Sequence, residues 1–111
     1  IEYAVSFGPS LVINGRALNE DRKLGGGINP RTAIGQRADG AILLLVIEGR
    51  QVSSLGATYD DLADVMISFG AVNAANLDGG SSSLMMYDGK KLTTSAFIGA
   101  ERALPTCILV K

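Results

Sequence analysis

Asn76-Leu77-Asp78-Gly79-Gly80-Ser81-Ser82-Ser83 places one carboxylate, two glycines and three hydroxyls between two apolar runs, residues 71–75 and 84–87. Because glycine accepts positive φ at no steric cost, the stretch predicts a strand that ends in a sharp turn. The backbone N–H groups of such a turn, together with serine hydroxyls, can form a concave site for an anion. The alternative is an ordinary strand–turn–strand corner, because Gly, Asp and Ser dominate turns of every kind.

Length and composition narrow the possible classes of protein. The 111 residues fit one domain, and an apolar fraction of 47% argues against disorder. Ten basic and eleven acidic residues give a net charge of −1, which predicts no nucleic-acid partner. No run approaches the roughly 18 apolar residues that span a bilayer, so we expect no membrane span. The chain has no His, which excludes a Ser–His or Cys–His triad and a His-based metal site within it.

One helix is predicted, over Tyr59–Phe69. Its apolar residues fall at helical spacing and form a single stripe, Leu62, Val65, Met66 and Phe69. Thr58 can cap its first turn, and the acids that follow favour its positive end. Gly70 is suited to end the helix.

The remaining chain predicts strands and turns, among them a two-residue hairpin turn at Asn14-Gly15. The expected strands are Tyr3–Phe7, Ser10–Ile13, residues 31–37, 41–48 and 71–77, two short strands flanking Asp88–Lys91, and a closing strand Leu104–Val110. The run at 41–48 is apolar throughout, so we expect a central strand that is covered on both faces. The glycine-containing stretch 19–29 predicts an exposed mobile loop, either a lid or a plain surface excursion. The fold class is α+β: a mixed, mainly antiparallel sheet with one principal helix packed on it.

Three stretches together resemble a known family. The first is the stretch 76–83 quoted above. The second, upstream, is Asn29-Pro30-Arg31-Thr32-Ala33-Ile34-Gly35, and the third, downstream, is Glu101-Arg102-Ala103-Leu104-Pro105-Thr106. In order and spacing they resemble the signatures of the phosphodiester glycosidase family. Leu84 stands where that family often has Thr, and the family's Asn-, Gly- and Phe-rich N-terminal segment has no counterpart. We therefore expect residues 1–111 to be a single domain that is the C-terminal part of a longer phosphodiester glycosidase domain.

The resemblance implies a hydrolase that cleaves a sugar-1-phosphodiester, in a glycan, a cell-envelope polymer or an exopolysaccharide. The leaving group is a phosphate ester that is stable as an anion, so the general acid of ordinary glycosidases matters less. Asp78 is the first candidate for nucleophile, general base or metal ligand, and Glu101 is the second carboxylate. The candidates for phosphate or substrate binding are Arg31, Thr32, Gly79, Gly80, Ser81, Ser82 and Arg102.

Each of these residues has an ordinary structural alternative. Arg31 could form a structural ion pair, Asp78 could stabilise an Asx turn, and Glu101 with Arg102 could be a solvated rim. The corresponding alternative function is a non-catalytic module that binds carbohydrate or phosphate. A third reading is a purely structural fragment in which the glycines only reverse the chain.

The predicted partners follow from the same resemblance. We expect a glycan or sugar-phosphate substrate and, as a possible second partner, the N-terminal part of the domain as a separate chain. No cofactor is required by the sequence, although a hard divalent cation, calcium or magnesium, would suit the carboxylates. The resemblance implies an extracellular or cell-envelope location.

Overall fold

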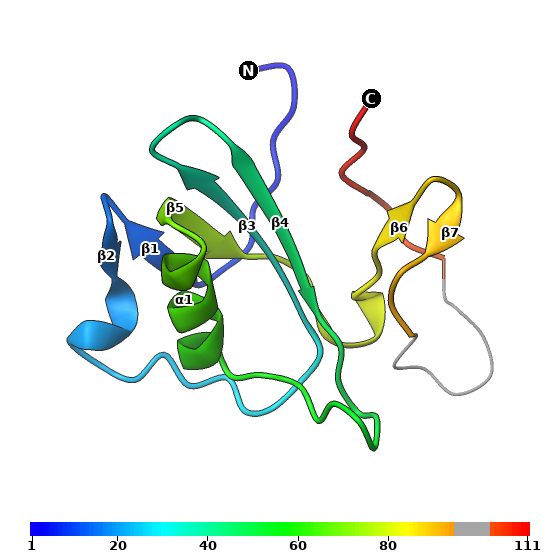
Figure 1. Cartoon of the computed structure of the whole chain (residues 1–111), viewed down its shortest axis with the longest axis horizontal. Helices are drawn as coiled ribbons and strands as arrows, with labels where there is room; N and C mark the ends of the chain where they lie inside the picture. The colour runs from blue at the N-terminus through cyan, green and yellow to red at the C-terminus, as the bar shows by residue number, and fades with distance from the viewer. Residues whose placement is uncertain (95–102) are drawn as a thin grey trace.

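The computed structural model describes residues 1–94 and 103–111. Its main sheet has five strands, β1 (Ser10–Ile13), β2 (Arg16–Ala17), β3 (Arg31–Arg37), β4 (Ile42–Ile47) and β5 (Ala71–Asn76), in the order β2-β1-β5-β3-β4. Every neighbouring pair is antiparallel. The other elements are α1 (Tyr59–Ser68), the 3₁₀ turns η1 (Leu18–Glu20) and η2 (Gly80–Ser82), and the hairpin β6 (Met86–Tyr87) and β7 (Lys90–Lys91). Figure 1 shows α1 on one face of the sheet, which confirms the predicted α+β class.

Helix α1 forms as its sequence predicts. The Thr58 hydroxyl accepts from the Asp61 N–H at 3.1 Å, and the Asp61 carboxylate accepts from the Thr58 N–H at 2.8 Å. This reciprocal capping box satisfies donors that the first helical turn leaves open. At the other end Gly70 adopts a φ of +84°, and its N–H donates to the Ile67 carbonyl at 2.9 Å. Both helix ends were therefore predictable from local sequence.

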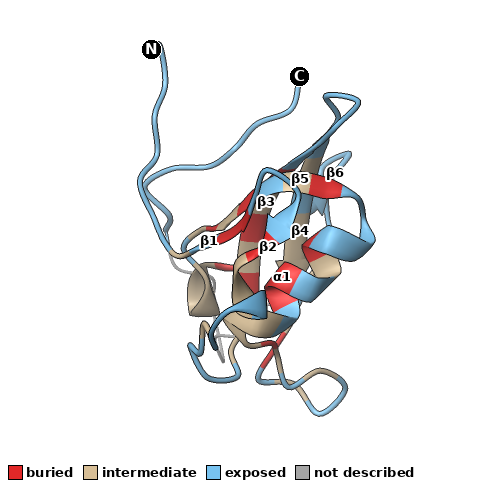
Figure 2. Ribbon diagram, turned by 90° about the vertical axis from the view of Figure 1, so that its left-hand side faces the viewer, coloured by how far each residue is buried: buried red, intermediate tan, exposed pale blue. Residues whose placement is uncertain are grey.

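The core lies between α1 and the sheet, where Figure 2 shows the buried residues. It consists of Leu11, Val12, Ala17, Ala33, Leu62, Ala63, Met66, Ala71 and Ala74. Small residues in β3 and β5 allow the helix to approach closely. A Cβ atom at Gly35 would lie 3.2 Å from the Met66 sulfur, and Met66 itself is 1% exposed. This packing gives one face of the sheet a continuous apolar cover.

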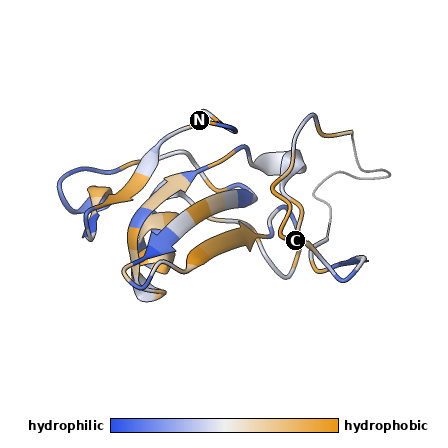
Figure 3. Cartoon of the chain, turned by 90° about the horizontal axis from the view of Figure 1, so that it is seen from above, coloured by the Kyte–Doolittle hydropathy of each residue, from blue (hydrophilic) through white to orange (hydrophobic). Residues whose placement is uncertain are grey.

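The position of β4 corrects one prediction. The apolar run was expected to be central and covered on both faces, but β4 is the last strand in the sheet order. Its residues Leu43, Leu45 and Ile47 pack toward the core, whereas Ile42 and Leu44 on the other face are 58% and 38% exposed. Figure 3 shows the apolar character along the whole of β4. The run therefore has two apolar faces, and only one of them is covered by described residues.

The uncovered face contains a shallow hollow. Its volume is about 370 Å³, and its lining comes from β1, β3, β4 and β5. The lining residues are Ser10, Val12, Ile13, Ile34, Gly35, Gln36, Ile42, Asn73, Ala74 and Ala75. We name this surface the open face of the sheet.

Two further strand predictions are wrong. Residues 1–9 contain no strand, and the segment Ala103–Lys111 is exposed and contains none either. Both predicted hairpins are present, because Asn14-Gly15 joins β1 to β2 and Asp88-Gly89 joins β6 to β7. The second differs in its bounds, because Lys90 and Lys91, expected in the turn, form strand β7, and the strand expected after Lys91 is absent from the described residues. Asn14 and Asp88 both have a φ of 50°, as these tight turns require. Within the described residues, no helix has the length and apolar character needed to cross a membrane.

Candidate functional site

The stretch Asp78–Ser83 lies against the beginning of β3. The Leu77 N–H donates to the Thr32 carbonyl, and the Gly80 N–H donates to the Pro30 carbonyl, both at 2.8 Å. These two hydrogen bonds hold the glycine turn beside β3 after β5 has ended at Asn76. Two of the three stretches that carry the family resemblance are therefore brought together, although more than 40 positions separate them in the sequence.

Glycines make this contact possible. A Cβ atom at Gly79 would lie 2.9 Å from the Pro30 carbonyl oxygen, which is closer than real Cβ atoms approach. At Gly56, where φ is +118°, a Cβ atom would lie 2.5 Å from the Asn29 carbonyl carbon and oxygen. Gly49 would place a Cβ atom 2.7 Å from the Pro30 nitrogen. Three separate segments thus approach Asn29–Pro30 through positions that have no side chain, and we call this crossing the glycine junction.

The N–H groups of the turn are only partly available for a ligand. The Gly80 N–H is bonded to Pro30, and the Ser82 N–H donates to the Gly79 carbonyl at 3.0 Å. The predicted cradle of backbone amides from Gly79 to Ser82 is therefore partly used in stabilising η2. Thr32 donates its hydroxyl hydrogen to the buried Ser83 hydroxyl at 3.2 Å. Ser83 belongs to the same serine run, and nothing in the sequence distinguishes it from its two neighbours.

Arg31, predicted to bind phosphate, is 6% exposed and bound to main-chain carbonyls. Its Nε donates to Ala57 O at 2.9 Å, and its Nη2 donates to Gly26 O and Gly27 O at 2.5 and 2.8 Å. The guanidinium carbon also lies 4.1 Å from the centre of the Tyr59 ring. Three of the five N–H donors of the guanidinium are thus committed to carbonyl oxygens. These contacts give Arg31 a structural role, while its binding of phosphate stays a prediction.

The glycine loop at residues 25–27 is bonded to α1 through Asp60 and to β3 through Arg31. Beside the Arg31 contacts, the Asp60 carboxylate accepts from the N–H groups of Leu24 and Gly25, both at 3.0 Å. These backbone hydrogen bonds lower the pKa of Asp60 from its ordinary value of 3.8, and the bond from Leu24 has the largest effect. The Tyr59 N–H donates to the Gly25 carbonyl at 3.0 Å. The predicted loop is exposed, but it is held to α1 and β3 rather than hanging free as a lid.

This attachment predicts a pH-dependent stability. The pKa of Asp60 is lower in the folded protein than in the unfolded chain. Its contribution to the free energy of unfolding is therefore fully present above the pKa of the unfolded chain, and it is lost as the pH falls through the pKa of the folded protein. We expect Asp60→Asn to unfold at lower urea concentration than the wild type at pH 7, and the difference to shrink toward pH 2. Asp88→Asn, in the separate β6–β7 hairpin, is the control. A difference between wild type and Asp60→Asn that is independent of pH would contradict this assignment.

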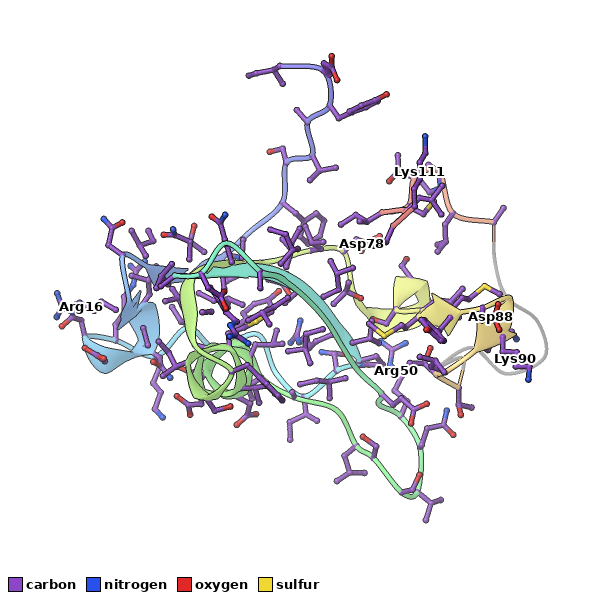
Figure 4. All side chains as sticks on the ribbon, turned by 45° about the horizontal axis from the view of Figure 1, so that its top comes forward. Arg16, Arg50, Asp78, Asp88, Lys90 and Lys111 are labelled. Atoms are coloured by element: carbon purple, nitrogen blue, oxygen red, sulfur yellow. The ribbon has the colours of Figure 1, made fainter. Side chains whose placement is uncertain are left out.

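The predicted catalytic residues are only partly described. Asp78 is exposed, and Figure 4 shows it on the side of the glycine turn that faces the C-terminal segment. Glu101 and Arg102, the second carboxylate and the second phosphate-binding arginine, lie outside the described residues. Among residues 1–94 and 103–111, no three acidic or cysteine side chains gather as metal ligands would. The suggested divalent cation therefore gains no support from the described residues.

Two residues of interest were missed by sequence reasoning. The Nη2 atom of Arg50 lies 3.6 Å from the position of a Cβ atom on Gly80. Asn76 is 1% exposed, and its Nδ2 donates to the Gly8 carbonyl at 2.9 Å. Its Oδ1 has no hydrogen-bond partner among the described residues. Arg50 carried no local signal, because it lies outside the three signature stretches and its neighbour Gly80 is 30 positions away in the sequence.

Comparison with known proteins gives one family. A family model described as phosphodiester glycosidase matches residues 1–111. The SPbeta prophage-derived uncharacterized protein YomE of Bacillus subtilis (strain 168) is 41% identical over 76 residues, which are 68% of this chain and 12% of that protein. N-acetylglucosamine-1-phosphodiester alpha-N-acetylglucosaminidase of Bos taurus is 36% identical over 62 residues, 56% of this chain and 12% of that protein.

Solved structures give the same answer for the fold. A Burkholderia pseudomallei K96243 protein described as exported matches with a TM-score of 0.65 and 46% identity, over 68% of this chain and 15% of its own. The catalytic domain of zebrafish N-acetylglucosamine-1-phosphodiester alpha-N-acetylglucosaminidase matches with a TM-score of 0.66 over 89% of this chain and 38% of its own. At 21% identity, the zebrafish likeness concerns the fold alone. The chain thus spans only a minor part of the length of each of these four proteins.

Proposed function

Because the chain belongs to the phosphodiester glycosidase family, we propose that the protein is a hydrolase that cleaves a sugar-1-phosphodiester. The bond broken is the one between the anomeric carbon and the phosphate oxygen. Water supplies the hydroxyl group that the sugar retains, and the phosphate leaves as a monoester that takes the remaining proton. The substrate class we propose is a glycan or cell-envelope polymer that contains such a linkage.

The chemistry assigns a distinct task to each candidate residue. A phosphate monoester is a weak base, so its departure needs little help from a general acid. The anomeric centre becomes positively charged in the transition state, and a carboxylate beside it stabilises that charge or attacks it directly. We assign this task to Asp78, with Glu101 as the second carboxylate. Arg102, Thr32, the N–H groups of Gly79 and Ser81 and the hydroxyl groups of Ser81 and Ser82 are assigned to the phosphate and the sugar.

One observation carries this proposal. The turn that bears Asp78 is held on the start of β3 by the hydrogen bonds of Leu77 to Thr32 and of Gly80 to Pro30. The two stretches that resemble the family signatures are thus adjacent, and both present hydroxyl groups at the contact, those of Thr32 and Ser83. A merely local turn would not need an intimate approach to a second signature stretch, which Gly79 permits.

A second candidate is a module that binds a sugar phosphate without cleaving it. It is favoured because several donors of the candidate site are already bonded to carbonyls of the protein itself. Arg31 donates to three carbonyls, and the N–H groups of Gly80 and Ser82 donate to two more. It is also favoured by Leu84, which lacks the hydroxyl of the family's usual threonine.

We also propose that further polypeptide completes the site, either the N-terminal part of the same domain or a separate chain that corresponds to it. The open face supports this, because Ile13, Ile42 and Leu44 leave apolar surface uncovered on the side of the sheet away from α1. The longer chains of the matched proteins support it as well, since 38% or less of each is covered. An extracellular or cell-envelope location is proposed from the likeness to a protein described as exported.

The test is sugar release from a matched pair of substrates by the intact protein. One substrate is the methyl phosphodiester of N-acetylglucosamine 1-phosphate, and the other is the methyl glycoside that lacks the phosphate. We expect kcat/KM to be about 100-fold or more higher for the phosphodiester, because of the better leaving group and charge-assisted contacts to phosphate. Tight binding of the phosphodiester with no sugar released would reject the hydrolase and favour the binding module.

A further inference from the structure

We propose that Arg50, beside Gly80, forms a phosphate-binding subsite that the family signatures do not include. This proposal rests on the proposed function, because it assumes a sugar-phosphate ligand at the glycine turn. The group that Arg50 would bind is a phosphate oxygen. It could belong to the phosphate that is cleaved or to a second phosphate farther along the ligand, and the arrangement of the site favours the second.

The main chain holds Arg50 in a defined and unusual position. Its φ is +57°, in the left-handed region that residues other than glycine seldom adopt. The N–H of Arg50 donates to the Leu55 carbonyl at 3.1 Å, and Gln51 and Ser54 exchange two backbone hydrogen bonds at 3.0 and 3.2 Å. The preceding residue, Gly49, is packed on Pro30 of the glycine junction. The backbone conformation at residue 50 therefore determines the direction in which the Arg50 side chain extends from the glycine junction.

The guanidinium of Arg50 lies beside the glycine turn, residues 78–83. Its Nη2 donates to the Asn29 side-chain oxygen at 3.1 Å and lies 3.6 Å from the position that a Gly80 Cβ atom would take. Because Gly80 has no side chain, the backbone of the turn beside this cation is left uncovered. Arg50, Asn29 and Gly80 thus bring together parts of three segments, two of which are signature stretches.

Arg50 forms no ion pair with another residue in the described part of the chain. The ion pairs between described residues are those of Arg16 with Glu20 and Asp21, and of Arg37 with Asp39. Arg50 is exposed, and only one of its five N–H donors is used in the hydrogen bond to Asn29. Arg31, by contrast, is buried with three donors committed. Of these two arginines, Arg50 is the one that can offer a fork of donors to a phosphate.

The place of Arg50 relative to Asp78 bears on which phosphate it binds. In Figure 4 the two side chains lie on opposite sides of the ribbon through residues 79–82. A phosphate attached to the carbon attacked at Asp78 would be next to that carboxylate, on its own side of the turn. The cation across the turn is therefore suited to the next phosphate of a longer ligand. This gives a substrate class: a glycan or polymer that carries successive phosphate groups.

The experiment uses two ligands that differ by one phosphate, N-acetylglucosamine-1-phosphoglycerol and the same compound with a second phosphate on the glycerol. Binding is measured by calorimetry, and sugar release is measured separately, for the intact wild-type protein and for Arg50→Gln. We expect Arg50→Gln to weaken binding of the two-phosphate ligand about 10- to 100-fold and to leave the one-phosphate ligand nearly unchanged. Arg50→Lys keeps the charge but loses the fork, and we expect an intermediate affinity.

The control is Arg37→Gln, which removes an exposed arginine of β3 that is paired with Asp39. Equal weakening of both ligands by Arg50→Gln would keep the subsite and assign it to the scissile phosphate. If Arg50→Gln binds both ligands as Arg37→Gln does, the subsite is overturned. If the wild-type protein releases no sugar but its binding of the ligands is weakened by Arg50→Gln, the hydrolase is rejected and the subsite is kept. If Arg50→Gln unfolds, Arg50→Lys decides, and affinity equal to wild type for both ligands would overturn the proposal.

Discussion

Arg31→Met is expected to lower the free energy of unfolding by about 2–4 kcal/mol. The arginine connects the carbonyls of Ala57, Gly26 and Gly27 and lies over the Tyr59 ring. Without it, the buried Ala57 carbonyl loses a charged donor, and the cation–π contact disappears. The carbonyls of the exposed loop can turn to water, which keeps the loss below the full sum of three hydrogen bonds.

The measurement is urea unfolding of the wild type, Arg31→Met and Arg31→Lys, with Arg37→Met as the control from the same strand. Arg37 has an exposed ion pair with Asp39, so its replacement should cost less than about 1 kcal/mol. Arg31→Lys should fall between the wild type and Arg31→Met, because an ammonium group cannot reach three carbonyls in the planar geometry of a guanidinium. Equal stability of the Arg31 and Arg37 variants would remove the structural role of Arg31.

The second large effect concerns catalysis. Asp78→Asn is expected to reduce sugar release about 10²- to 10⁴-fold, because the amide carries no charge to stabilise or attack the anomeric centre. The substitution also separates the two readings of Asp78. Asparagine supports an Asx turn as well as aspartate does, so a purely structural Asp78 would survive the change. Loss of turnover with unchanged stability would therefore point to the carboxylate itself.

Local features of the fold could be predicted from the sequence. The hairpins at Asn14-Gly15 and Asp88-Gly89 follow from the positive φ that two-residue turns require, and both formed, although the second turn is two residues shorter than expected. Helix α1 follows from its stripe, from the Thr58 cap and from Gly70. In each case the residues that decide the structure are neighbours in the sequence. No long-range information is needed for such elements.

Features that depend on distant contacts were less predictable. An apolar run such as β4 indicates that both faces can be buried, but it does not say what covers them, and its outer face is open to solvent among the described residues. The sequence likewise showed that Arg31 belongs to a signature stretch, but the carbonyls that surround it come from residues 26, 27 and 57. Arg50 stood outside every motif and is brought to Gly80 only by the fold.

Catalysis at the glycine turn is tested by the rate of sugar release by Asp78→Asn and Asp88→Asn from the methyl phosphodiester of N-acetylglucosamine 1-phosphate. Both variants replace an aspartate that precedes a glycine, and Asp88 lies in the β6–β7 hairpin outside the main sheet. We expect a loss of about 100-fold or more for Asp78→Asn and wild-type rates for Asp88→Asn. Equal rates for the two variants would contradict the assignment of catalysis to the glycine turn.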